Sequence, residues 1–279
     1  MILLTFLGAN SYTETTYIWG EKRRRTAFSA AACADFLQCS EVFTFLTDQA
    51  RQVNLEAFRK EMAAAGIPVR DFSIPVGKDD SELWQIFSVL HTSVAEGDEI
   101  ALEVTNGMRS APILSLMAAM FMKTGRGVNV RHLLYGAFDV ARAEGLSETP
   151  IFDLSPMLTL LDWAIAAERF NTSGDSRKMA ELLLAYSKQI SLENLSRETS
   201  ENSRSFAFRD VADSFTKVTS ALFVLRPYEA MQAVAQMSEK IDAVSGVMDQ
   251  SPEVQPLSSL LDRIRNTYSP IADPAPENP

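Results

Sequence analysis

The sequence has few of the residues that mark secreted, metal-binding or membrane proteins. It contains two cysteines and two histidines in 279 residues. Cys33 and Cys39 stand six positions apart and match neither a disulfide framework nor a four-ligand zinc site, so we expect two free thiols and no metal. No run of about 18 apolar residues occurs without charges, which argues against a membrane span. The opening strand-like run is too short, and lacks the basic start, for a signal peptide. A cytoplasmic protein is predicted.

Excess positive charge is also missing. The net charge is −10, with 14 basic and 18 acidic residues in 1–150 and 12 and 18 in 151–279. Because neither half is basic, broad binding to duplex DNA through its phosphates is disfavoured. An anionic ligand could still bind at a local site made of backbone donors and one or two cations.

The common nucleotide-binding glycine motifs are absent as well. Neither GxGxxG, which marks ordinary NAD sites, nor GxxxxGK[ST] occurs. His91 and His132 fall on a predicted helix and a predicted strand without any partner spacing, so we interpret both as structural. The basic run at 21–26 is interpreted as a solvated hairpin tip.

The first 140 residues alternate between strand-like and helix-like patterns. Two short strands joined by a charged hairpin are predicted within 16–30. The other predicted strands are 2–8, 41–47, 69–75, 99–104 and 129–138, and the predicted helices are 30–37, 51–65, 81–95 and 109–123. This alternation predicts an α/β fold with a Rossmann-like, mainly parallel sheet covered by helices.

The pattern changes near Pro150 and becomes helical. Helices are predicted at 155–170, 178–190, 206–225, 227–245 and 255–268, with a loop or helix break at 191–205. We therefore expect an α/β domain at 1–150, an all-α helical domain at 151–268, and a Pro-rich linker or disordered tail at 269–279.

Small polar residues follow the predicted core strands. The first strand ends at Gly8, Ala9, Asn10 and Ser11, and the strand 99–104 ends at Thr105, Asn106 and Gly107, with Arg109 in the first turn of the next helix. Lys78 follows a third strand. Ligands of open parallel sheets bind outside the carboxyl ends of the strands, and helix N-termini favour phosphate. These turns predict a nucleotide-like anion site.

Ordinary structural roles stand beside this interpretation. Asn10 and Asn106 are also typical turn or cap residues, and Ser11 is a typical cap. Arg109 could pair with a carboxylate, and Lys78 could simply be solvated.

Five segments, in this order, resemble a known family. They are "LLTFLGANSYTETTYIW" (3–19), "IPVGKDDSELWQIF" (74–87), "VTNGMRSAPILSLMA" (104–118), "LLYGAF" (133–138) and "PIFDLSPMLTLLDWAIAAERFNTSGD" (150–175). Together they resemble CARF domains, the CRISPR-associated Rossmann folds of type III CRISPR accessory proteins. The third segment resembles the Thr-(Asn/His)-Gly-x-Arg signature turn of that family.

The resemblance implies a homodimer that binds one cyclic oligoadenylate, most often the four-membered ring, across its two-fold axis. The ring is the second messenger of type III CRISPR defence. By motif position, the ligand-binding residues would be Gly8, Ala9, Asn10, Ser11, Lys78, Thr105, Asn106, Gly107 and Arg109. No cofactor or metal is implied.

One departure from the family is clear. Relatives often continue into a HEPN ribonuclease marked by Arg-x4-His, whereas Ile86 and Gly127 stand five positions before the two histidines. No HEPN ribonuclease activity is expected from this chain. It could be the sensor portion of an effector, a lone sensor or a ring nuclease.

We consider three candidate functions for this sequence. The first is a sensor that relays ring binding to an effector or an assembly. The second is a metal-independent ring nuclease that would use Ser11, Lys78 and Arg109. The third is an unrelated dinucleotide-binding Rossmann protein, in which Asp48 would contact a ribose. Ring size and output stay open.

Overall fold

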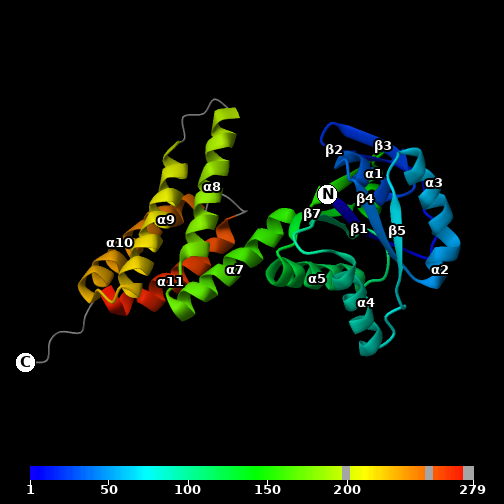
Figure 1. Ribbon diagram of the computed structural model, residues 1–279. Coiled ribbons are helices and arrows are strands. Elements are labelled where there is room, and N and C mark those ends of the chain that lie inside the picture. Colours follow the sequence, from blue (N-terminus) through cyan, green and yellow to red (C-terminus); the bar gives the residue numbers. More distant parts are fainter. Residues whose placement is uncertain (197–201, 249–253, 273–279) are drawn as a thin grey trace, which may run out of the picture. The chain divides into compact units, whose positions relative to one another are not determined.

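The computed structural model describes residues 1–196, 202–248 and 254–272 (Figure 1). The contacts between Cα atoms divide the chain into two units, Met1–Ser155 and Pro156–Pro279. The first unit is α/β and the second is helical. None of the described helices is both long enough and apolar enough to cross a membrane.

One sheet organises the first unit, with the strand order β3-β2-β8-β7-β6-β1-β4-β5. Its strands are β1 (Ile2–Leu7), β2 (Thr15–Trp19), β3 (Lys22–Thr26), β4 (Glu41–Leu46), β5 (Val69–Ser73), β6 (Glu99–Glu103), β7 (Asn129–Gly136) and β8 (Thr149–Asp153). Neighbouring strands are parallel except in the pairs β2–β3 and β7–β8. The predicted Rossmann-like, mainly parallel sheet is confirmed.

Helices cover the sheet because its central strands are apolar on both faces. All residues of β1 and β4 except the first of each are buried, as expected for a strand covered on both sides. The helices are α1 (Ser29–Phe36), α2 (Asp48–Ala50), η1 (Arg51–Leu55), α3 (Glu56–Ala64), α4 (Asp80–Ser93), α5 (Ala111–Arg126) and α6 (Phe138–Ala143).

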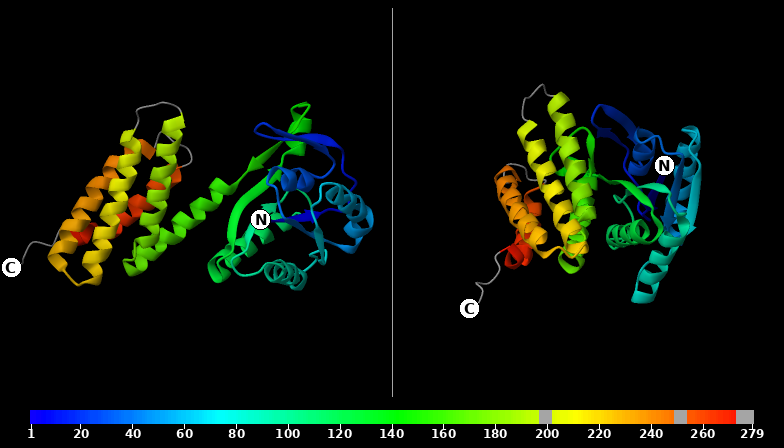
Figure 2. Two further views of the ribbon diagram at one scale, coloured as in Figure 1. Left: turned by 45° about the horizontal axis from the view of Figure 1, so that its top comes forward. Right: turned by 60° about the vertical axis from the view of Figure 1, so that its left-hand side comes forward.

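The direction of the chain sorts these helices between the two faces. From β4 to β5 the chain moves away from β1, and from β5 through β6 to β7 it moves the other way. Since crossovers between parallel strands are right-handed, α3 falls on one face and α4 and α5 on the other. Both figures agree, with α4 and α5 side by side and α1 near α3 (Figures 1 and 2).

The second unit consists of long helices around one apolar core. They are α7 (Ser155–Ser173), α8 (Arg177–Ser196), α9 (Asn202–Phe223), α10 (Pro227–Met248) and α11 (Gln255–Ala272). Phe170 anchors the core because its ring stacks on Tyr268 at 4.5 Å and meets Phe215 edge-on at 5.1 Å. The predicted helical half is confirmed.

Several predicted element boundaries were wrong. Arg109 and Ser110 precede α5, because Ser110 is the N-cap and Pro112 occupies the first turn. The predicted break at 191–205 is helical at 191–196 and 202–205, and α11 continues past 268 to Ala272. Residues 197–201 and 273–279 lie outside the described part. Helix α6 was not among the predicted elements.

Candidate functional site

Two polar turns flank the point where the sheet changes direction. Strand β1 lies between β4 and β6, and the chain adds strands outward on each side of it. The crevice outside the carboxyl ends of β1 and β6 is therefore the topological switch point, where such sheets bind ligands. We call residues 8–12 the first turn and residues 105–109 the second turn. A Cβ placed on Gly8 would lie 3.6 Å from the backbone nitrogen of Gly107, so the two turns are in contact.

The second turn requires glycine at position 107. Gly107 has a φ of +104°, and a Cβ placed on it would lie 2.7 Å from the Cβ of Phe6. Phe6 is a buried residue of β1. Any side chain at position 107 would combine an unfavourable backbone conformation with a steric clash. The tight packing of the second turn onto β1 therefore depends on this glycine.

A buried carboxylate holds the second turn from below. Glu103 is fully buried, and its Oε1 accepts hydrogen bonds from Ser29 Oγ and from the backbone nitrogen of Thr105, both at 3.0 Å. Its Oε2 accepts from Thr5 Oγ1 at 2.6 Å. Asn106 Nδ2 donates in turn to Ser29 Oγ at 3.0 Å. This network, which we call the Glu103 network, fixes both Thr105 and Asn106.

The buried position shifts the acid–base behaviour of the network and of two tyrosines beside it. Burial raises the pKa of Glu103, and the hydrogen bonds that it accepts oppose that rise only in part. Burial also raises the pKa of Tyr12 to about 12, and that of Tyr17 well above its usual value. Both phenols stay protonated at neutral pH and can donate hydrogen bonds.

Strand β7 closes the other side of the second turn. The backbone nitrogen of Gly136 donates to Thr105 Oγ1 at 2.7 Å. A Cβ on Gly136 would lie 3.1 Å from Ser29 Cβ and 3.2 Å from Thr105 Oγ1. A larger residue at position 136 would therefore press on the Glu103 network.

A side-chain amide holds the first turn. Asn54 Nδ2 donates to the carbonyl oxygens of Gly8 at 2.7 Å and Asn10 at 2.8 Å. Asn54 lies in η1, the π-helical turn, and only 5% of its surface is exposed. The backbone nitrogen of Gly8 also donates to the hydroxyl of Tyr12. Asn54 satisfies two carbonyl groups for which no other donor occurs in the described part of the chain.

A cavity of about 340 Å³ opens between these elements. Four of the predicted site residues line it: Asn10, Ser11, Thr105 and Asn106. Gly8, Ala9 and Gly107 are not among its lining residues. The full lining is Asn10, Ser11, Tyr12, Thr13, Tyr17, Ala27, Thr105, Asn106, Tyr135, Gly136, Phe138, Asp139 and Arg142.

The two predicted cations lie outside this cavity. Lys78 Nζ pairs with Glu82 Oε1 at 2.9 Å. Glu82 also accepts from the backbone nitrogens of Gly77 and Lys78, so the pair belongs to the start of α4. Arg109 is exposed and has no hydrogen-bond or ion-pair partner among the described residues. The structure therefore does not gather Ser11, Lys78 and Arg109 into one catalytic group.

Sequence reasoning missed the wall of the cavity formed by β7 and α6. Tyr135, Phe138, Asp139 and Arg142 line this wall. Their signal was the segment "YGAFDVAR", in which another glycine-bearing strand end is followed by two charges in helical spacing. Helix α6 has only six residues, which made it hard to recognise.

Both histidines have partners typical of structural residues. His132 Nδ1 lies 2.7 Å from Asp153 Oδ2, and its ring meets Trp19 edge-on. His91 packs against Phe87 and Phe121. Across the described residues, no group of three or more His, Cys, Asp or Glu side chains could hold a metal ion.

A dinucleotide site would need a different first connection. Asp48 is exposed at the start of α2, directly after β4, where a ribose contact would be expected. However, β1 leads into the β2–β3 hairpin instead of entering a helix. The pyrophosphate-binding helix N-terminus of an ordinary NAD site is therefore not formed after β1.

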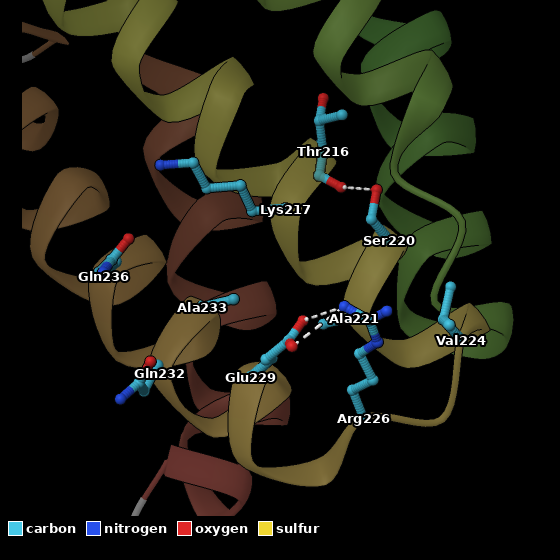
Figure 3. Close-up of a pocket in the computed structure, with 10 residues that line it drawn as sticks. All are labelled: Thr216, Lys217, Ser220, Ala221, Val224, Arg226, Glu229, Gln232, Ala233 and Gln236. Atoms are coloured by element: carbon cyan, nitrogen blue, oxygen red, sulfur yellow. Dashed lines mark hydrogen bonds and ion pairs between the residues drawn. The ribbon is translucent and has the colours of Figure 1, made fainter.

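The second unit has a hollow of its own, about 430 Å³, between α9 and α10 (Figure 3). At one end Arg226 forms an ion pair with Glu229, as the dashed lines show. Ser220 donates to the backbone carbonyl of Thr216 along the same helix. These polar groups already satisfy one another, and no predicted site residue lies here.

Comparison with known proteins relates the chain to a CRISPR-associated protein. Residues 159–271 match the family model described as "CRISPR-associated protein MJ1674, second domain". The chain is also 33% identical over 134 residues to CRISPR-associated protein MJ1674 of Methanocaldococcus jannaschii. That alignment covers 46% of this chain and 21% of the relative, so the chain spans only about a fifth of the relative's length. The matches support a relationship to CRISPR-associated proteins.

Proposed function

We propose that this protein is a cytoplasmic sensor of cyclic oligoadenylate in type III CRISPR signalling, with cyclic tetra-adenylate, the four-membered ring, as the first candidate ligand. One ring would bind across a homodimer, and the helical unit would relay the event to an effector or an assembly. The supporting observation is the cavity at the switch point, where Asn10, Ser11, Thr105 and Asn106 converge. Its position suits a nucleotide ligand, and the similarity to a CRISPR-associated protein fits the proposed context.

An exposed apolar face supports the homodimer. Trp84 of α4 and Ile113, Met117 and Phe121 of α5 are between 56% and 70% exposed. With their neighbours, most of these side chains surround a shallow apolar hollow on α4 and α5. Soluble monomers seldom expose contiguous apolar patches of this kind. Since α5 begins directly after the second turn, two-fold packing along α5 would bring two such turns close together.

Ligand titration tests the proposal directly. The purified chain is titrated calorimetrically with cyclic tri-, tetra- and hexa-adenylate and with NAD, while light scattering gives its mass. We expect a dimer that binds one ring per two chains. A monomer that binds no ring, or a protein that binds NAD alone, would overturn the proposal. Labelled ring recovered as linear product after incubation with excess protein would add ring cleavage to ring binding.

Replacing Arg109 with alanine should weaken ring binding and leave the fold intact. The side chain is exposed and has no partner among the described residues, so a ligand phosphate could accept its hydrogen bonds. A charged hydrogen bond of this kind contributes about 1.5–3 kcal/mol. Arg131→Ala is the matched control, because Arg131 pairs with Glu99 near the opposite ends of β7 and β6. Unchanged affinity would exclude Arg109 from the site, and loss of the dimer would assign it to the interface.

A further inference from the structure

Helix α6 presents two opposite charges to the cavity, and neither is neutralised by another described residue. Asp139 and Arg142 both line the cavity and stand three positions apart on α6. Neither has a hydrogen-bond or ion-pair partner through its side chain among the described residues. Other charges at the same spacing do pair. These pairs are Glu56–Arg59, Lys178–Glu181, Arg226–Glu229 and Asp262–Arg265.

Arg142 is the cation that an anionic ligand would meet in this cavity. Of the described residues that line it, Arg142 alone carries a positive side chain. The whole chain has a net charge of −10, so its general field does not attract anions. A phosphate bound within this cavity would therefore be neutralised by Arg142, with neutral donors such as Asn106 beside it, whereas Arg109 lies outside the cavity. Guanidinium groups suit this role because they can donate two parallel hydrogen bonds to phosphate.

Asp139 lies one helical turn from Arg142 and limits which group of the ligand can lie beside it. An ionised carboxylate only accepts hydrogen bonds, and it repels phosphate. A ligand group beside Asp139 must then donate an N–H or O–H, as a base amino group or a ribose hydroxyl does. Phe138 and Tyr135 add aromatic surface to the same wall, on which a base can stack.

We propose that α6 is the nucleotide-reading element of the cavity. Arg142 contacts a phosphate of the ligand, and Asp139 accepts a hydrogen bond from its nucleoside. This inference rests on the proposed function, and it adds to the two turns a third contacting element that no motif assigns. The ligand class is a nucleotide in which a phosphate and a donor group lie about one helical turn apart.

Affinity measurements on matched variants of the full chain test this inference. The variants are Arg142→Ala, Arg142→Lys, Asp139→Ala and Asp139→Asn, and the charge controls are Arg131→Ala and Glu144→Gln. Each is titrated with cyclic tetra-adenylate and with linear tetra-adenylate. Glu144 is exposed at the end of α6 and does not line the cavity.

We expect Arg142→Ala to weaken binding roughly 10- to 100-fold, with lysine restoring part of the loss. Asp139→Ala should weaken binding roughly tenfold, whereas asparagine, which keeps an acceptor oxygen, should stay within about threefold of wild type. The two controls should bind like wild type.

The outcomes separate this inference from the proposed function. If wild type binds the ring and Arg142→Ala binds equally well, the role of Arg142 is wrong. If both Asp139 variants bind more tightly, Asp139 merely repels the ligand. If wild type ignores the ring but binds the linear oligomer in an Arg142-dependent way, the sensor function fails and the reading of α6 stands. Absence of binding to both oligomers overturns both.

Discussion

The two turns of the cavity occupy equivalent places at neighbouring strand ends, yet they are held in different ways. The second turn rests on the Glu103 network, which lies beneath it in the core. The first turn is held from the side by the amide of Asn54, which reaches its carbonyl oxygens from η1. One turn therefore depends on the packing and protonation of the core, and the other depends on a single side chain of a neighbouring helix.

This difference determines how far a ligand that moves one of the turns can displace the rest of the first unit. The Glu103 network links the second turn to β1, to α1 and, through Thr105, to β7. A shift of the second turn would therefore displace several strands and helices of the first unit. The first turn has fewer links, so we expect it to adapt to a ligand with less effect on the rest of the unit.

The largest effect is expected from Gly107→Ala, which breaks the second turn. The added methyl group would lie 2.7 Å from Phe6 Cβ, at a residue whose φ is +104°. Strain and overpacking together should lower the free energy of unfolding by about 3 kcal/mol, measured by urea denaturation.

Gly97→Ala is its control, because Gly97 has a φ of +75° and nothing within 4 Å of an added Cβ. This variant carries the backbone strain without the clash and should cost about 1 kcal/mol. Equal losses in the two variants would show that β1 yields to accommodate the methyl group, and the close packing of the second turn on β1 would then not be required.

A smaller effect is expected from Asn54→Ala, which breaks the first turn. The carbonyl oxygens of Gly8 and Asn10 each lose the hydrogen bond that Asn54 donates. Unfolding free energy should fall by about 1–3 kcal/mol, and ring affinity should fall with it because the first turn is no longer fixed. Gln52→Ala, at an exposed position in the same η1 turn, is the control and should change neither quantity. A stable Asn54→Ala protein with wild-type affinity would mean that the first turn holds its shape without the amide.

The sequence predicts the residues at the strand ends of the site better than it predicts the residues that hold those strand ends in place. Gly8, Asn10, Thr105 and Asn106 could be placed because each follows an apolar run, and parallel strands bring such ends to one edge. Asn54 and Ser29 could not, since each lies in a different local pattern and joins the site only through the tertiary fold. Their polarity within apolar surroundings is a weak signal that applies equally to caps and turns.

Charged residues were the least predictable part. Lys78 was assigned to the ligand because it follows a strand, and in the structure its Nζ pairs with Glu82, four residues later, at the start of α4, a contact that the strand-end position did not indicate. Arg142 was missed because the short helix α6 shows no clear periodicity. Long side chains reach several ångströms from their backbone, so a strand-end position fixes the location of a small polar group better than that of a cation.

The smallest expected effect concerns the pH dependence of the second turn. Burial raises the pKa of Glu103 above the unfolded carboxyl value of about 4.3. Between that value and the raised folded pKa, the folded state binds more protons than the unfolded state. The protonated carboxyl therefore makes its full contribution to the unfolding free energy below a pH of about 4.3. This contribution is lost as the pH rises towards the folded pKa, by at most about 1.4 kcal/mol per pH unit.

Comparison with Glu103→Gln isolates this titration, because glutamine keeps the shape and does not ionise. Unfolding free energies of both proteins are measured from about pH 4 upward. The other carboxyl groups are present in both proteins, so their contributions cancel when the unfolding free energy of the variant is subtracted from that of wild type. We expect this difference to fall as pH rises and then to level off. A difference that rises over this interval would mean that the three donors to Glu103 outweigh its burial. The second turn would then rest on a charged carboxylate, and an anionic ligand above it would meet a repulsion that the first turn does not impose.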